Sequence, residues 1–147
     1  ALNNFKDSNF FNGGLINKKK IKEHSSKILS KFSVNTNNVE LKSQFLSGGN
    51  LQKLIIGREL ITSPELLICF NPTWGLDVGA INYIHETLIK INEQNKSIIL
   101  ISTDTEELLK LSDKISVIYK GKLSKIMKTK DINAEKLGLL MGGGNVD

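Results

Sequence analysis

Apolar residues follow two different patterns along this chain. In several segments they recur every three or four positions, which is the spacing of one face of a helix. We predict helices over residues 17–32, 50–61, 77–94 and 133–141, and a shorter helix that ends near Leu111. Elsewhere the apolar residues form short continuous runs, which are typical of strands. We predict strands at 66–70 and 97–101, followed by a hairpin of 114–119 and 123–127.

Each of the three longest predicted helices has an apolar face suited to a core. These faces consist of Ile21, Ile28 and Phe32; of Leu51, Leu54, Ile55 and Leu60; and of Ile81, Ile84, Leu88 and Ile91. Asn17 is the expected N-cap of the first helix, and Thr103 with Glu106 forms a capping-box pattern before the short one. The hairpin is expected to turn at 120–122. Residues 1–16 and 33–44 lack a clean period and are expected to be irregular.

Composition limits the possible classes of function. The 147 residues carry a net charge of +5, almost all of it from lysine, because Arg58 is the only arginine. Nucleic-acid readers rely on arginine forks and interleaved aromatics, so we expect no nucleic-acid partner. Cys69 is the only cysteine, which excludes an internal disulfide. No apolar run approaches the roughly 20 residues that cross a bilayer. We therefore expect a soluble α/β chain whose contact with a membrane is indirect.

The run Leu46-Ser47-Gly48-Gly49-Asn50-Leu51-Gln52-Lys53 has the clearest chemistry in the sequence. Two glycines after a serine, at the start of a predicted helix, form a tight turn with free backbone N–H groups. The N-terminus of a helix attracts anions through these groups and through its dipole. The serine adds a hydroxyl donor, and the glycines let the backbone approach a phosphate closely. We interpret the run as a phosphate cradle, although Ser-Gly-Gly is also an ordinary loop sequence.

The order of the segments that follow resembles the ATP-binding cassette (ABC) ATPases. The cradle resembles their signature motif. Next in the family's order come an apolar strand that runs into Pro72-Thr73, which resembles Walker B, and then Gly75-Leu76-Asp77, which resembles the D-loop. The strand 97–101 with Ser102-Thr103-Asp104 follows where the family has its switch segment, and the segment 111–115 comes after it. The resemblance covers most of the chain from about Phe45 to Gly121. It implies that Ser47, Gly48, Gly49, Asn50 and Gln52 face an ATP held by a partner domain.

Two departures from the family pattern limit what the chain does by itself. No Gly-x-x-x-x-Gly-Lys-Ser/Thr sequence occurs, so the chain has no P-loop to hold β- and γ-phosphates. In addition, Phe70 stands where the family has the Walker B Asp, and a phenyl ring offers no ligand to Mg²⁺. Asn71 stands in place of the catalytic Glu and cannot accept a proton, and Thr103 replaces the switch His. Asn71, Thr103 and Asp77 of the D-loop are the candidate catalytic residues, and we expect no metal ligand, because Phe70 replaces the Walker B Asp.

The resemblance implies a partial P-loop NTPase fold of the α/β class. Residues 1–61 correspond to part of the helical signature subdomain. Residues 62–147 correspond to the rest of the RecA-like core from Walker B onward, without the P-loop strand. The whole chain is then a C-terminal fragment of an ABC ATPase domain. Its motifs, with Gly13-Gly14 and the tail 137–142, look most like the second half of tandem importer ATPases for simple sugars or nucleosides. The stretch 77–85 favours the nucleoside branch.

The function implied is that of the ATP-binding subunit of a bacterial importer, with ATP and Mg²⁺ as cofactors of the assembled full-length protein. Its expected partners are the N-terminal ATPase domain of the same chain or a second cassette, transmembrane permease subunits and, indirectly, a solute-binding protein. Its expected location is the cytoplasmic face of the membrane. The alternatives are a soluble ABC ATPase that acts on nucleic acid or ribosomes, and a purely structural cassette half.

Several residues admit a second, simpler interpretation. Asp77 is either a D-loop carboxylate that couples two sites or only the N-cap of the next helix. Trp74 either contacts a partner domain or is a partly exposed loop aromatic. His24 and His85 lie about sixty residues apart without a partner at ligand spacing, so packing or surface roles are favoured over metal binding.

Overall fold

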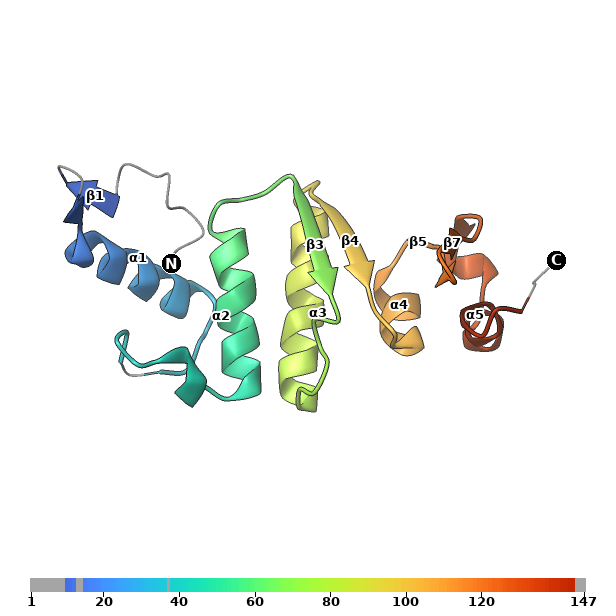
Figure 1. Cartoon of the computed structure of the whole chain (residues 1–147), viewed down its shortest axis with the longest axis horizontal. Coiled ribbons are helices and arrows are strands. Elements are labelled where there is room, and N and C mark those ends of the chain that lie inside the picture. Colours follow the sequence, from blue (N-terminus) through green and yellow to red (C-terminus); the bar gives the residue numbers. More distant parts are fainter. Residues whose placement is uncertain (1–9, 13–14, 37, 145–147) are drawn as a thin grey trace. The chain divides into compact units, whose positions relative to one another are not determined.

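The computed structural model describes residues 10–12, 15–36 and 38–144 (Figure 1). Contacts divide the chain into two units. The first contains Ala1–Glu65 and Thr73–Ile84, and the second contains Leu66–Pro72 and His85–Asp147. Helix α3, Val78–Glu93, contributes its first turns to one unit and its remaining turns to the other.

The first unit is built on helices α1, Lys18–Lys31, and α2, Gly48–Leu60. Asn17 caps α1 as predicted, because its Oδ1 accepts a hydrogen bond of 3.1 Å from the N–H of Lys20. Phe32 packs over Gly57 of α2 so closely that a Cβ at Gly57 would lie 2.6 Å from its ring. The core joins Ile28, Phe32 and Val34, and Leu29, Leu54, Leu60 and Ile61 pack against it.

Two predictions for this unit are wrong. Ile55, placed on the apolar face of α2, is exposed, whereas Ile56 and Gly57 are buried. The described part of 1–16 is not wholly irregular, since β1, Phe11–Asn12, pairs with β2, Leu15–Ile16, in an antiparallel ladder. The Gly13-Gly14 pair lies outside the described residues. The loop before α2 contains the 3₁₀-helix η3, Ser43–Phe45.

The second unit begins with the two predicted strands. Strand β3, Leu66–Phe70, runs parallel to β4, Ser97–Ile101, with Leu66 opposite Ser97 and Phe70 opposite Ile101. Leu67 and Cys69 are buried, but Leu66, Ile68 and Phe70 are exposed, as are Ile99 and Ile101. Continuous apolar strands of this kind are typical of sheets covered on both faces. One face of this sheet is therefore uncovered within the part of the chain that the structure describes.

The predicted hairpin is present with a tighter turn. Strands β6, Ile118–Tyr119, and β7, Lys122–Leu123, are antiparallel neighbours, and only Lys120 and Gly121 lie between them. Both have positive φ, 45° and 77°, as a two-residue type I′ turn requires. The ladder then breaks at Ser116 and Ser124 and resumes between β5, Lys114–Ile115, and β8, Met127–Lys128.

Helices α4, Thr105–Leu111, and α5, Ala134–Met141, complete this unit, with the 3₁₀-helix η4, Thr129–Asp131, before α5. The predicted capping box at Thr103 and Glu106 is wrong by one residue. Asp104 is the N-cap, and its Oδ1 accepts bonds from the N–H groups of Glu106 at 2.9 Å and Glu107 at 3.1 Å. A carboxylate receives these two donors more strongly than a hydroxyl does. The core contains Ile115, Val117, Ile132 and Leu137.

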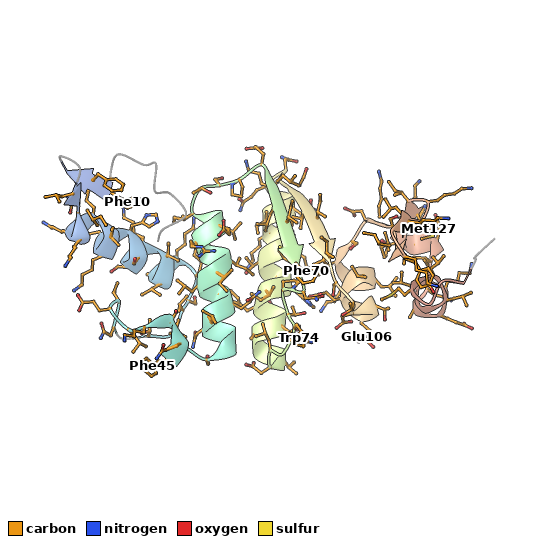
Figure 2. The ribbon with its side chains drawn as sticks, in the orientation of Figure 1. Phe10, Phe45, Phe70, Trp74, Glu106 and Met127 are labelled. Carbon is orange, nitrogen blue, oxygen red and sulfur yellow. The ribbon has the colours of Figure 1, made fainter. Side chains whose placement is uncertain are left out.

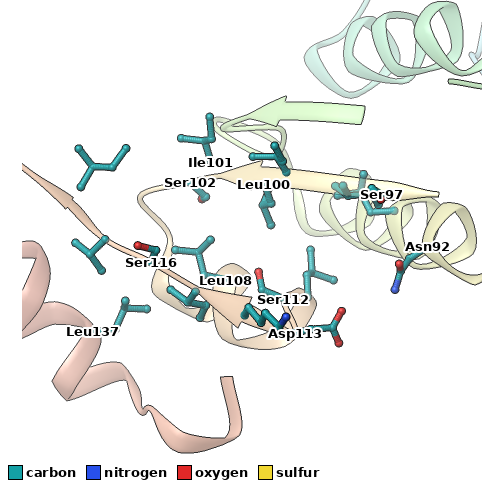
Figure 3. Close-up of a pocket in the computed structure, with 18 of the residues that line it drawn as sticks. Asn92, Ser97, Leu100, Ile101, Ser102, Leu108, Ser112, Asp113, Ser116 and Leu137 are labelled. Atoms are coloured by element: carbon teal, nitrogen blue, oxygen red, sulfur yellow. The ribbon is translucent and has the colours of Figure 1, made fainter. Parts of the chain in front are cut away.

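A cavity of about 840 Å³ lies within the second unit (Figure 3). Its walls include the whole of β4 on one side and residues 111–118 on the other, with parts of α3 and α5. In the described part of the chain, β4 pairs only with β3, and β5 pairs only with β8. The backbone edge of β4 that faces away from β3 therefore has no neighbouring strand among the described residues.

Candidate functional site

The signature run is organised around the N-terminus of α2. Ser47 is the N-cap, with extended backbone, and its Oγ accepts bonds from the backbone N–H of Asn50 at 3.4 Å and from its side-chain amide at 3.0 Å. Ser47 and Gly48 are exposed, while Gly49, Asn50 and Gln52 are half-buried. The first N–H groups of a helix have no intrahelical acceptor. This end of α2 therefore offers an anion both donors and a favourable dipole.

Asn50 connects the signature to the loop after α1. Its Oδ1 accepts a 2.8 Å bond from the N–H of Asn35. One turn later, the ammonium of Lys53 lies 4.4 Å from the centre of the Tyr83 ring, and the Tyr83 hydroxyl donates to the carbonyl of Phe32 at 2.8 Å. Two of these contacts hold α2, one to the loop after α1 and one to Tyr83 of α3, and the bond from Tyr83 to Phe32 fixes the second of them.

The glycines differ in their roles. A Cβ at Gly49 would lie 2.9 Å from the Cβ of Ala80, so the absence of a side chain there lets α2 approach the start of α3. A Cβ at Gly48 would make only an ordinary contact of 3.5 Å with Leu76. The phosphate interpretation, which used both glycines, therefore applies more directly to Gly48. Gly49 brings the signature beside the Asp77 segment.

Asp77 acts as a cap in this structure. Its Oδ1 accepts a 2.9 Å bond from the N–H of Ala80 at the start of α3. The preceding turn depends on Gly75, whose φ of 73° is left-handed. Trp74, beside it, is 85% exposed (Figure 2). The capping contact accounts for the geometry of Asp77, and its coupling role stays a prediction.

The other candidate residues meet where β3 and β4 end. Asn71 has a φ of 43°, which Asn tolerates better than most residues. Its Oδ1 accepts a 3.2 Å bond from the N–H of Thr103, and its own N–H donates to the carbonyl of Ile101 at 2.8 Å. The amide thus bridges the ends of the two strands. Sequence reasoning assigned the two positions to one nucleotide site but did not foresee this bond.

A magnesium ion does not fit at this end of β3. Phe70 is 73% exposed and offers only carbon. Asn71 uses its amide oxygen on Thr103. Within the described ranges, no group of three or more His, Cys, Asp or Glu side chains is arranged to hold a metal. The side chains of Phe70 and Asn71 thus offer Mg²⁺ no free carboxylate, and the degenerate site stays a prediction.

Sequence reasoning missed one buried polar cluster in the second unit. His85 Nε2 lies 3.1 Å from Glu107 Oε1, and both side chains are buried. Burial and, secondarily, the charge of Glu107 raise the pKa of the Cys69 thiol to about 11. No spacing rule links these positions, since they belong to β3, α3 and α4. No signal in the local sequence indicates that these side chains meet.

Curated proteins resemble the chain along most of its length. The nucleoside import ATP-binding protein NupA of Lactococcus lactis subsp. cremoris is 40% identical over 134 residues, which is 91% of this chain and 26% of NupA. The guanosine import ATP-binding protein NupO of Bacillus subtilis is 38% identical over 88% of this chain and 26% of NupO. A ribose import ATP-binding protein, RbsA of Oceanobacillus iheyensis, is 36% identical over 94% of this chain and 28% of RbsA. No protein-family model matches the chain.

Solved structures give the fold. A metal-chelate type ABC transporter in an inward-facing conformation superposes with a TM-score of 0.73 at 16% identity, over 94% of this chain and 54% of that one. The ATP-binding cassette MJ0796, in a dimeric post-hydrolysis state with ADP and phosphate, gives a TM-score of 0.65 at 23% identity, over 80% and 51% of the two chains. The chain belongs to the ABC ATPase family.

The predicted α/β fold class is confirmed as a partial ABC ATPase domain. This ABC chain spans about a quarter of the curated relatives and about half of the solved chains that it matches. It lacks the P-loop sequence, and the edge of β4 that faces the cavity is unpaired in the described structure. Among the described helices, none is both long and apolar enough to cross a membrane. The division at residue 61 stays a prediction.

Proposed function

We propose that this chain is part of the ATP-binding subunit of an importer for nucleosides or simple sugars, and that its signature run completes an ATP site on a partner cassette. The names of NupA, NupO and RbsA support the solute class. The full-length protein would hydrolyse MgATP at the cytoplasmic face of the membrane. Its partners would be a second ATPase domain and transmembrane permease subunits, with a solute-binding protein acting indirectly.

The proposal rests on the contrast between two sites, the N-terminus of α2 and the ends of β3 and β4. The signature has a capped helix, an exposed hydroxyl at Ser47 and a buttressed Asn50. At the ends of β3 and β4, by contrast, Phe70 lacks oxygen and Asn71 holds the Thr103 backbone. The N-terminus of α2 is suited to bind a phosphate, whereas the ends of β3 and β4 lack a metal ligand and a catalytic base. A domain of this kind contributes to catalysis by completing its partner's site.

The two alternatives make different predictions. A soluble ABC ATPase acting on nucleic acid or ribosomes would need basic side chains suited to phosphate forks, and Arg58, the only arginine, is paired with Glu59 at 2.8 Å. A purely structural cassette half would tolerate substitution of Ser47. The similarity to import proteins favours the transport function over the first alternative. The second is tested by the substitutions argued in the Discussion.

We expect the 147-residue chain alone neither to hydrolyse ATP nor to bind MgATP usefully. Without a P-loop it has one contact surface for the γ-phosphate and none for the rest of the triphosphate. Calorimetric titration with MgATP checks this. The expected Kd is weaker than about 100 μM, or about 5.5 kcal/mol of binding free energy. A tighter constant, or turnover by the isolated chain, would contradict the composite-site proposal.

A further inference from the structure

The buried contact between α3 and α4 is the strongest polar feature that the proposed function does not use. Glu107 is 2% exposed, and glutamate is almost never buried to this degree unless it is paired. His85 Nε2, 3.1 Å from Glu107 Oε1, is one such partner. A buried carboxylate that loses its partner keeps the full cost of desolvation, so such a pair constrains both of its helices.

Glu107 lies in the first turn of α4, so its contact with His85 acts on the residues that begin this helix. The N–H of Glu107 donates to Asp104, the N-cap, and the N–H of Asp104 donates to Ser102 Oγ at 3.0 Å. Thr103 lies between Ser102 and Asp104 and donates its own N–H to Asn71. Hydrogen bonds thus link α3 to the first turn of α4, and the backbone of Ser102–Asp104 joins that turn to the bond between Thr103 and Asn71 at the ends of β3 and β4.

In the usual capping box, the glutamate at this position of a helix reaches back to the N–H of the cap residue. Here the N–H of the cap residue is donated to Ser102, and the Glu107 carboxylate contacts another helix. Asp104 and Glu107 therefore close the first turn of α4 and also link this helix to α3. The Nδ1 atom of His85 has no hydrogen-bond partner among the described residues, so the ring reaches Glu107 through Nε2 alone, and the tautomer of His85 decides which of the two atoms donates.

We propose that His85 and Glu107 are a positioning pair that holds the Ser102–Asp104 segment against Asn71. The pair touches no substrate and acts through the first turn of α4. It keeps the amide of Asn71 engaged with the Thr103 backbone in the absence of nucleotide. This inference concerns the second unit alone and does not rest on the proposed transport function.

Hydrogen exchange measured by mass spectrometry on the full chain tests the proposal. His85→Phe keeps the ring volume but removes the donor. We expect backbone N–H groups of Thr103, Glu106 and Glu107 to exchange about ten- to a hundredfold faster, the effect of losing one hydrogen bond to a charged group. His85→Gln, whose amide can donate to Glu107, should restore most of the protection. His24→Phe, at the other histidine, is the matched control and should leave this segment unchanged.

A double-mutant cycle separates positioning from packing. If the pair is coupled, His85→Phe combined with Glu107→Leu should accelerate exchange less than the product of the two single effects, because each single variant already removes the contact between the two side chains. If His85→Phe does not fold, His85→Asn, which is too short to reach Glu107, replaces it in the cycle. Unchanged Thr103 exchange in the single variants, multiplicative effects in the cycle, or no rescue by His85→Gln would overturn the proposal.

Discussion

Ser47→Arg and Gly48→Asp are each expected to abolish transport-coupled ATP hydrolysis in the full-length assembly. Both residues are exposed at the N-terminus of α2, where the proposed γ-phosphate contact is made. A bulky or negative group there would occupy the place of the phosphate. Loss of one contact that stabilises transition-state charge costs about 2.7 to 4 kcal/mol, or about 10² to 10³ in rate. Steady-state ATPase measurements in membranes or detergent check the result.

Asn71→Ala is the matched comparison in the same assay. The Asn71 side chain is an amide and not a catalytic base, and it hydrogen-bonds to the backbone of Thr103. Removing this side chain should therefore leave ATP turnover nearly unchanged. Restoring Phe70→Asp with Asn71→Glu should not double turnover, because Thr103 still replaces the switch His and φ at position 71 is 43°. A strongly impaired Asn71→Ala would mean that this site works after all. Normal activity in Ser47→Arg would support the purely structural alternative.

The isolated 147-residue chain is expected to self-associate or to be poorly ordered around β4. An unpaired strand edge is a template for pairing with another chain. Here the edge of β4 faces a cavity of about 840 Å³, and the exposed sheet face carries Ile68, Phe70 and Ile99. Light scattering over a wide range of concentration should show species larger than the monomer, with a broad thermal transition.

Substitutions on the uncovered face sharpen that test. Ile68→Lys with Ile99→Lys places charge on the sheet face and should shift the chain toward monomer. Leu15→Lys, at an even more exposed apolar residue of β2, is the control and should leave association unchanged. A monodisperse and highly stable monomer without any substitution would show that the cavity and the open face need no covering.

Periodicity was sufficient for the longer regular elements of this chain, although it missed the short ladder of β1 and β2. The strands Leu66–Phe70 and Ser97–Ile101 have the predicted bounds, and each helix lies within two residues of its expected range. The local sequence also predicted helix starts at Asn17 and Asn133, because a capping side chain bonds to a backbone N–H only a few residues away. The Ser47 cap of α2 follows from the same residue preference.

What periodicity could not supply were contacts between distant segments. Glu107 and His85 are 22 residues apart, and nothing in their local sequence indicates that they meet. The role of Gly49 depends on Ala80 of another helix. The apolar run of β3 predicted a strand, but which face is covered depends on elements that lie elsewhere. The candidate site was therefore predicted as a set of positions, and its geometry had to come from the structure.

ATP-dependent protection of a cysteine at the signature tests the central claim most directly. Cys69 gives little background with maleimide, because its raised pKa, about 11, leaves scarce thiolate at neutral pH. Ser47→Cys should be labelled readily in the isolated chain. In the full-length assembly, a non-hydrolysable ATP analogue at about ten times its Kd should slow this labelling about tenfold. Ser26→Cys, at an exposed serine of α1, should not respond. Equal labelling of Ser47→Cys with and without nucleotide in the assembly would contradict the account.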